Sequence, residues 1–307
     1  MSIHLTILGY NSATPRVNSH PTSQWINVNE KYILLDCGEG TQVQLRRAKA
    51  KFSRINLILI SHLHGDHVFG LIGLISSLQL LGRKAPLEIY GPMGLKDFIE
   101  NQLRHTQSKC NFELNFHELA HDDSRLIYED KKIEVFNLPL DHRIYCNGYL
   151  IKEKPALKNL NIEAIQQFPE IQTCDYFNLK KGKDFMLSNG EIISNEILTF
   201  PQVKPLSYAF CSDTRYNEKL IDLIRDVDLL YHETTFDKSL AELADKTGHS
   251  TAEQAAIIAK KANVGKLIMG HFSNRYMNYD LLLNEARSIF PNSHLPETLQ
   301  MIEVERV

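Results

Sequence analysis

One short polar segment constrains this chain more than any other feature. Residues 61–67 read Ser-His-Leu-His-Gly-Asp-His and directly follow the apolar run 55–60. On a strand, side chains two positions apart point the same way, so the first two histidines should share one side, and a turn at the glycine should bring the aspartate and third histidine round from the next helix. Imidazole and carboxylate are ligands that zinc prefers. The segment therefore predicts two metal ions side by side, with His62 and His64 on one and Asp66 and His67 on the other.

Length and composition narrow the class of protein. A chain of 307 residues fits one large domain or two average ones, and a hydrophobic fraction of 43% suffices for a core. No apolar run approaches a membrane span, and the N-terminus shows no signal-type block, so we expect no membrane partner. The five scattered cysteines form no C-x-x-C pair, which predicts a reducing cytoplasm and argues against a thiolate metal site. The net charge of −3 does not indicate nucleic-acid binding, so an anionic partner would need local basic patches or the metals.

The hydrophobic pattern predicts an α/β fold, because short apolar runs alternate with amphipathic or alanine-rich segments. The run after Asn56 lacks polar alternation, which is typical of a strand buried on both faces. We expect strands over 3–8, 25–28, 32–36, 55–61, 88–92, 133–138, 206–211, 228–231 and 266–269, and helices over 41–51, 68–81, 94–101 and 251–262.

Between residues 152 and 197 the regular pattern breaks down. Prolines, paired glutamines and a lysine-rich stretch interrupt any core element there. Long irregular stretches within a compact domain are usually functional or mobile. We therefore interpret residues 152–197 as an inserted arm on a single domain spanning 1–307; the alternative is a solvated surface excursion without a partner.

Three more candidate ligands each follow the end of an apolar strand: His142, Asp213 and His271. In open α/β sheets, ligand sites gather beyond the carboxyl ends of strands. Alone, each residue is a weak signal, but together with the histidine segment they complete a two-metal set. We expect His62, His64 and His142 to bind one zinc, Asp66, His67 and His271 to bind the other, and Asp213 to bridge both. Manganese or another divalent metal is the alternative to zinc.

With this ligand series the chain resembles the ribonuclease Z family of the metallo-β-lactamase fold. The ligand order alone is typical of the whole superfamily, whereas several further segments are specific to the family. They are Asp-Cys-Gly-Glu-Gly-Thr-Gln-Val-Gln at 36–44, the ligand loop with its continuation at 61–77, Tyr-Gly-Pro at 90–92, His-Glu-Thr-Thr at 232–235, Gly-His-Ser-Thr at 248–251, and Gly-His-Phe-Ser-Asn-Arg-Tyr at 270–276.

The resemblance implies a four-layer αβ/βα sandwich, two zinc ions, a homodimer and a protruding arm that grips the elbow of precursor tRNA. The implied activity is endonucleolytic removal of the 3′ trailer, which leaves a 3′-hydroxyl on the tRNA and a 5′-phosphate on the trailer. Two segments depart from the family pattern. The loop 8–18 has its own sequence, and the arm tip at 161–183 lacks the usual glycines and prolines but retains Lys180, Lys181 and Lys183 as candidates for RNA phosphate contacts.

The resemblance also assigns roles in the chemistry. Asp66 would combine metal ligation with acceptance of a proton from the attacking water, and His249, oriented by Glu233, would donate a proton to the departing 3′-oxygen. Arg275 is expected to bind phosphate with its planar guanidinium. From the residues alone, His249 has a second interpretation as the neighbour of a helix N-cap at Ser250 or Thr251.

Some alternatives stay open. The basic run at 46–51 fits either a phosphate-binding ridge or the solvated face of an amphipathic helix. Besides a pre-tRNA endonuclease, the chain fits a hydrolase of small phosphodiesters, sulfate esters or thioesters with the same fold, or a non-catalytic RNA-binding relative. The complete ligand set disfavours the last, and the arm together with the 232–235 and 248–251 segments favours the first.

Overall fold

The computed structural model describes residues 2–14, 16 and 19–306. The chain divides into two compact units, one formed by Met1–Lys152 with Leu206–Val307 and the other by Glu153–Pro205. We call them the main unit and the insert. Of the loop 8–18, residues 15, 17 and 18 lie outside the described residues. In the described part of the chain, no helix is long and apolar enough to cross a bilayer.

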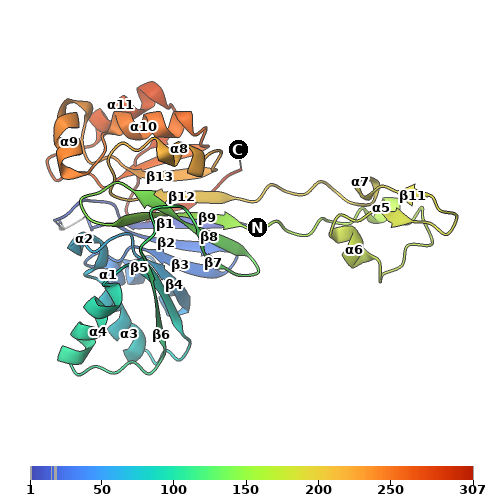
Figure 1. Cartoon of the computed structure of the whole chain (residues 1–307), viewed down its shortest axis with the longest axis horizontal. Helices are drawn as coiled ribbons and strands as arrows, with labels where there is room; N and C mark the ends of the chain where they lie inside the picture. Colours follow the sequence, from blue (N-terminus) through green and yellow to red (C-terminus); the bar gives the residue numbers. More distant parts are fainter. Residues whose placement is uncertain (1, 15, 17–18, 307) are drawn as a thin grey trace. The chain divides into compact units, whose positions relative to one another are not determined.

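The main unit is built on two seven-stranded sheets (Figure 1). In spatial order, the first sheet contains β16 (Met301–Glu303), β1 (Ile3–Gly9), β2 (Ser23–Val28), β3 (Lys31–Leu35), β4 (Ile55–Leu59), β5 (Leu87–Pro92) and β6 (Leu114–Leu119). The second contains β15 (Ser293–His294), β14 (Lys266–Gly270), β13 (Leu229–Glu233), β12 (Ser207–Cys211), β9 (Cys146–Glu153), β8 (Ile133–Leu140) and β7 (Leu126–Glu129).

Strand β4 shows why the central strands are apolar on both faces. Leu57 and Leu59 belong to the core between the two sheets, where they join Tyr149 of β9. The alternate residue, Ile58, belongs to a second core beneath the helices of the first sheet. Because β4 is covered on both sides and pairs in parallel with β3 and β5, polar residues are excluded from nearly all of it.

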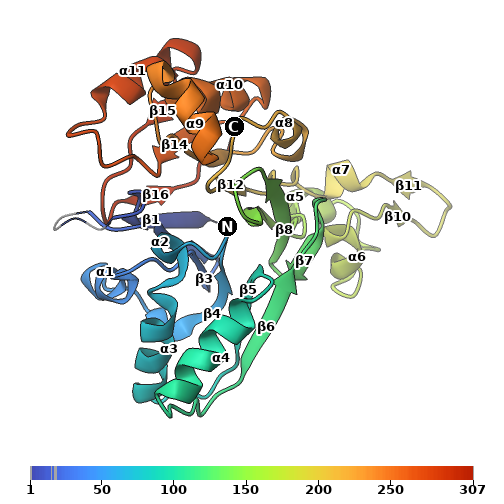
Figure 2. The same ribbon diagram turned by 60° about the vertical axis from the view of Figure 1, so that its left-hand side comes forward.

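Helices cover the outer face of each sheet (Figure 2). A third core, which contains Ala252, Ala256 and Leu282, lies between the second sheet and its helices. The predicted four-layer αβ/βα sandwich is therefore confirmed. The helices are α1 (Thr41–Arg47), α2 (Gly65–Val68), α3 (Leu71–Leu80) and α4 (Leu95–His105) in the first half and α8 (Lys219–Leu223), α9 (Ala241–Thr247), α10 (Ala252–Lys261) and α11 (Asp280–Ile289) in the second, with 3-10 turns η1 (Phe52–Arg54) and η2 (Lys238–Leu240).

The helix expected over 68–81 is interrupted, and the break lets the chain approach residues 37 and 38 closely, next to the ligand loop. Helix α2 ends at Val68 and α3 begins at Leu71. At the break, the backbone N–H of Gly70 donates to the carbonyl oxygen of Cys37 at 2.8 Å. A side chain at Gly70 would lie 2.2 Å from the carbonyl oxygen of Gly38, so only glycine permits this approach. The helix expected over 41–51 is also shorter, because it ends at Arg47.

The insert corrects the interpretation of an irregular arm. It contains α5 (Ile162–Ile165), α6 (Tyr176–Lys180), α7 (Asn195–Leu198) and a two-stranded sheet of β10 (Phe185–Met186) and β11 (Ile192–Ile193). A small apolar cluster of its own, which includes Ile165, Leu179 and Leu198, holds these elements together. The compact unit spans 153–205 rather than 152–197. Elements of two to five residues are too short to produce a periodic pattern, which explains why the sequence did not indicate them.

Candidate metal centre

All the predicted ligands gather at one edge of the main unit, beyond the ends of their strands. The histidine segment follows β4, while His142, Asp213 and His271 follow β8, β12 and β14. Their donor atoms form two groups in which every donor lies within 4.8 Å of the others. The first group is His62, His64, His142 and Asp213, and the second is Asp66, His67 and His271.

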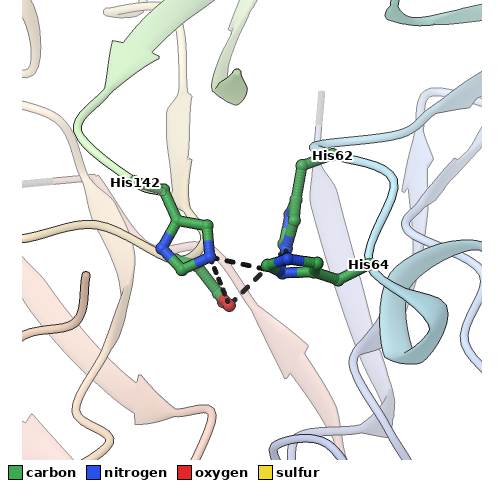
Figure 3. Close-up of side chains that lie close together, drawn as sticks. His62, His64 and His142 are labelled. Carbon is green, nitrogen blue, oxygen red and sulfur yellow. Dashed lines mark hydrogen bonds and ion pairs between the residues drawn. The ribbon is translucent and has the colours of Figure 1, made fainter. Parts of the chain in front are cut away.

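In the first group three imidazoles turn their nitrogens toward one another (Figure 3). Nε2 of His62 lies 2.9 Å from Nδ1 of His64, which lies 3.3 Å from Nε2 of His142. Oδ2 of Asp213 lies 3.6 Å from His62 Nε2 and 3.9 Å from His142 Nε2. Ligands bound tetrahedrally to zinc at about 2.0–2.1 Å stand roughly 3.3 Å apart. The donors of this group are therefore spaced like the edges of such a tetrahedron.

The second group has the same spacing around different atoms. Nε2 of His67 lies 3.5 Å from Oδ2 of Asp66 and 3.5 Å from Oδ1 of Asp213. Nε2 of His271 lies 3.4 Å and 3.2 Å from the same two oxygens. Asp213 thus directs Oδ2 to the first group and Oδ1 to the second, the arrangement expected of a bridging carboxylate.

Two buried atoms test whether these residues suit a metal. Nε2 of His67 and Oδ1 of Asp213 have no hydrogen-bond partner among the described residues, although both side chains are at most 3% exposed. A buried polar atom without a partner is costly, and a cation at this position would satisfy both atoms. The residues therefore fit divalent metal ions with nitrogen and oxygen ligands.

The far nitrogen of each of four imidazoles is held by a neighbour. His67 Nδ1 lies 2.7 Å from Asp36 Oδ2, and His142 Nδ1 lies 2.6 Å from the carbonyl oxygen of Gly248. The other two contacts are His62 Nδ1 to Ser61 Oγ at 3.0 Å and His271 Nδ1 to Thr235 Oγ1 at 2.9 Å. Such partners fix the ring orientation and the tautomer of a ligating histidine.

Asp36 supports the ligand loop, although no ligand pattern in the sequence includes it. Its side chain accepts hydrogen bonds from the backbone N–H of Ser61 at 2.7 Å and from the Ser61 hydroxyl at 2.9 Å, in addition to its contact with His67. The residue is fully buried and has a φ of 52°, which is unusual for a non-glycine residue. Its position directly after β3, at the head of the 36–44 segment, was the available signal.

The charges of the site favour a bound cation. Burial disfavours a charged His67, but the negative charges of Asp66, Asp213 and Asp36 overcome this and raise the pKa of His67 well above its usual value. Burial, followed by the proximity of His67, keeps the pKa of His62 well below its usual value, so His62 is neutral, the form that ligates metals. Burial disfavours an ionised Asp66, but the positive charge of His67 and a hydrogen bond with His271 lower its pKa, which suits Asp66 to ligation.

His249 and Glu233 come together as predicted from the resemblance, with Nδ1 of the histidine 2.9 Å from Oε1 of the glutamate. Burial disfavours the charged imidazole, but the Glu233 carboxylate raises the pKa of His249 to about 9. Of the two N-cap candidates, Thr251 rather than Ser250 caps helix α10. His249 also lies within donor distance of Asp213 and His271, so its geometry alone permits ligation as well as proton donation.

A cavity of about 550 Å³ is lined by donors of both groups, including His64, Asp66 and His271. Phe69 and Phe236 form apolar parts of its wall. Arg143 contributes a positive charge to the wall and Glu39 a negative one. The predicted phosphate ligand Arg275 is not among the lining residues; its guanidinium lies 5.7 Å from the centre of the Phe236 ring. Arg143, which no motif singled out, occupies the cavity wall instead.

The other basic candidates belong to neither ligand group. Lys181 and Lys183 are exposed on the insert, and Lys180 is half-buried in the last turn of α6. The ammonium of Lys181 lies over the Phe177 ring, 4.2 Å from its centre. In the basic run at 46–51 the charged residues are exposed, and the guanidinium of Arg46 lies over Phe52.

Two facing sheets, helices on both outer faces and a His- and Asp-lined site at the strand ends define a hydrolase of the metallo-β-lactamase fold. Over 95% of its length the chain is 44% identical to ribonuclease Z of Bacteroides thetaiotaomicron, 92% of which is covered. It is also 44% identical to ribonuclease Z of Parabacteroides distasonis, with 95% of this chain and 96% of that protein covered. The chain belongs to the ribonuclease Z family, and it is a hydrolytic endoribonuclease.

Two further similarities agree with this fold. The crystal structure of the short form of human tRNase Z superposes with a TM-score of 0.72 at 26% identity, covering 98% of this chain and 99% of that one. Residues 3–143 also match the family model of the anti-Pycsar protein Apyc1. That match ends just after His142 and so includes the histidine segment but not Asp213 or His271.

Proposed function

We propose that this protein removes the 3′ trailer from precursor tRNA by zinc-dependent phosphodiester hydrolysis. The products are a tRNA with a 3′-hydroxyl and a trailer with a 5′-phosphate. The observation that carries the proposal is the convergence of both donor groups on one cavity in a chain of the ribonuclease Z family. The name of the human structural relative, tRNase Z, supports tRNA as the substrate class.

Seven side chains would hold two zinc ions: His62, His64 and His142 one, Asp66, His67 and His271 the other, and Asp213 both. Bound there, the ions would lower the pKa of water toward about 7 and offset negative charge on the phosphate. Asp66 Oδ2 already accepts a hydrogen bond from the backbone N–H of Ala13 at 2.7 Å, so the carboxylate is fixed before substrate arrives. Asp66 would also accept the proton from the attacking water.

Proton delivery is the task of His249. The departing 3′-oxygen of the tRNA leaves as an alkoxide unless a proton reaches it, so a positioned acid speeds the step. Glu233 favours the protonated imidazole and directs Nδ1 toward itself, which leaves Nε2 to face substrate. Among the described residues, Nε2 has no hydrogen-bond partner.

Cleavage of a defined RNA tests the proposal most directly. Purified protein is incubated with a 3′-extended precursor tRNA and, separately, with bis-p-nitrophenyl phosphate, and the RNA cut is mapped to the nucleotide. We expect one cut at the 3′ end of the acceptor stem region and about two zinc equivalents per chain, following the two-metal chemistry. Turnover of the small ester without any RNA cleavage would instead support the alternative, a hydrolase of small phosphodiesters or sulfate esters.

We further propose that the protein works in the cytoplasm as a homodimer. The support for the dimer is the family resemblance. The support for a reducing compartment is that all five cysteines are free, three of them buried. Sedimentation of the purified protein at several concentrations should give a mass near twice 35.2 kDa; a monomeric mass throughout would contradict the dimer.

A further inference from the structure

Arg143 lies where two cavities meet. It follows His142 in the loop after β8 and lines the main cavity together with His64 and His249. It also lines a second cavity of about 270 Å³, whose other lining residues include His121 and Tyr145. The guanidinium thus belongs to the wall that separates the metal centre from a hollow beside it.

The guanidinium of Arg143 has no bonding partner among the described residues. The side chain is exposed, and no hydrogen bond or ion pair joins it to any other described residue. The neighbouring arginine behaves differently, because Arg215 donates to Asp141 Oδ1 at 2.9 Å and to the carbonyl oxygen of Asp245 at 2.8 Å. Arg143 therefore lines the same cavity as His64 and His249 while its guanidinium has no partner among the described residues.

We propose that Arg143 binds an RNA phosphate next to the scissile one, on the side of the departing 3′-oxygen. The proposal rests on the proposed function. Two observations set the side and the position. Arg143 packs against the turn that precedes His249, since its Cγ would lie 3.3 Å from a side chain at Gly248. Its exposure places it at the rim of the cavity, whereas the donors Asp213 and His271 are buried.

A guanidinium suits this task better than an ammonium. Its planar fork donates two parallel hydrogen bonds to phosphate oxygens, so it orients the strand as well as attracting it. Metal ions held by the two donor groups would offset the charge of the scissile phosphate, which leaves the Arg143 guanidinium at the rim for the next phosphate along the strand. Fixing that phosphate would hold the 3′-oxygen in reach of His249.

The test compares Arg143→Ala and Arg143→Lys with the control Arg104→Ala. Arg104 is also an exposed arginine, on α4, and lines none of the cavities described above. For Arg143→Ala we expect KM for precursor tRNA to rise about tenfold or more, which is the scale of one charge-assisted hydrogen-bond pair. The salt dependence of RNA binding should flatten by about 0.7–0.9 in log–log slope, the value of one phosphate contact. Turnover of bis-p-nitrophenyl phosphate, which has no neighbouring phosphate, should fall much less than the kcat/KM for precursor tRNA.

The lysine variant should keep the salt slope and recover only part of the affinity, and Arg104→Ala should match the wild type. If Arg143→Ala leaves both the RNA KM and the salt slope unchanged, the proposal is wrong. If RNA and bis-p-nitrophenyl phosphate turnover fall together with zinc content intact, Arg143 acts on the scissile phosphate and the neighbouring-phosphate assignment is overturned. Failure of the proposed function is a separate result, because the wild-type protein itself would then not cleave precursor tRNA.

Discussion

His249 and Glu233 are joined by a hydrogen bond of 2.9 Å between Nδ1 and Oε1, and the glutamate is fully buried. The same carboxylate accepts the backbone N–H of Thr214 at 2.8 Å and the hydroxyl of Thr235 at 2.5 Å. Thr235 in turn contacts Nδ1 of His271 at 2.9 Å. One buried carboxylate therefore connects the candidate proton donor to a candidate metal ligand.

Replacing His249 by alanine should slow RNA cleavage by about 10²–10⁴-fold, the range typical of general acid catalysis, with zinc content intact. The reason is that Glu233 holds Nδ1 of His249, so the ring is oriented for proton donation and not needed for ligation. Single-turnover rates and metal analysis of the same preparation provide the measurement. Loss of about one zinc equivalent would show instead that His249 is a ligand.

Replacing Asp36 by asparagine should weaken metal binding by about 10–100-fold, the usual effect of losing a carboxylate that supports a ligating histidine. Asparagine keeps the size of the side chain but removes the charge that orients His67 and holds the Ser61 loop. Competition with a chromophoric chelator would measure the affinity. Asp97→Asn, an exposed change on α4, is the matched control and should bind metal like the wild type.

Removing the metals should lower the thermal stability of the main unit. A ligand that binds only the folded state stabilises that state by about 2.7 kcal/mol when its concentration is 100 times its Kd. In a protein of this size, about 1 kcal/mol corresponds to a melting shift of roughly 2–4 °C. We therefore expect a fall of at least about 5 °C after treatment with a chelator, reversed by added zinc. An unchanged melting temperature would contradict metal binding at the buried atoms of His67 and Asp213.

The sequence indicated the candidate donors because each segment that contains one follows the end of a strand. A buried parallel strand must be apolar, so a polar ligand is conspicuous where the strand stops, as at His62 and Asp213. The strand bounds agree with the expected ones to within a few residues for the same reason. Whether these residues hold two zinc ions stays a prediction.

The other features of the site and the fold depend on contacts between residues distant in the sequence, which a sequence pattern does not reveal. Asp36 contacts His67 from a residue with a φ of 52°, which no motif encodes, and Arg143 lines the cavity from a loop that packs against Gly248. Arg275 was expected to bind phosphate because of the family resemblance; its guanidinium lies over Phe236, a residue of the cavity wall, and phosphate binding by Arg275 stays a prediction. The insert was missed as a folded unit because its elements are too short to show a period.

Replacing Gly38 by alanine should weaken metal binding and lower the melting temperature. A side chain there would lie 2.3 Å from the carbonyl oxygen of Asp66 and 2.7 Å from Cβ of Pro21, so the ligand loop would have to shift. Gly73→Ala on α3 is the control, because its new methyl group would meet only the flexible Gln42 side chain at 2.8 Å. Alanine in a helix is favoured over glycine by about 0.5–1 kcal/mol, so this variant should melt at the same temperature or higher. Equal behaviour of the two variants would show that the close approach at Gly38 does not position the loop.

Replacing the insert by a short Gly/Ser linker should raise KM for precursor tRNA and leave turnover of bis-p-nitrophenyl phosphate intact. The deletion is structurally mild, because Lys152 of β9 and Ser207 of β12 are paired neighbours on antiparallel strands and a short loop can join them. The insert has its own apolar cluster and supplies none of the candidate ligands, so the main unit should keep its zinc. A milder variant, with Lys180, Lys181 and Lys183 changed together to alanine, should flatten the salt dependence of tRNA binding by roughly 0.7–0.9 in slope for each phosphate that these lysines bind in the wild type.

The control for the triple change is Lys84, Lys96 and Lys109 to alanine, which removes the same charge from exposed positions of the main unit. If only the insert lysines matter, the insert acts as a binding surface that positions RNA while the metal centre performs the chemistry. Loss of both activities in the deletion variant, with zinc content and fold intact, would make the insert part of the active site. An unchanged KM for precursor tRNA after the deletion would mean that the insert of this protein has no role in holding RNA, and that affinity comes from the main unit alone.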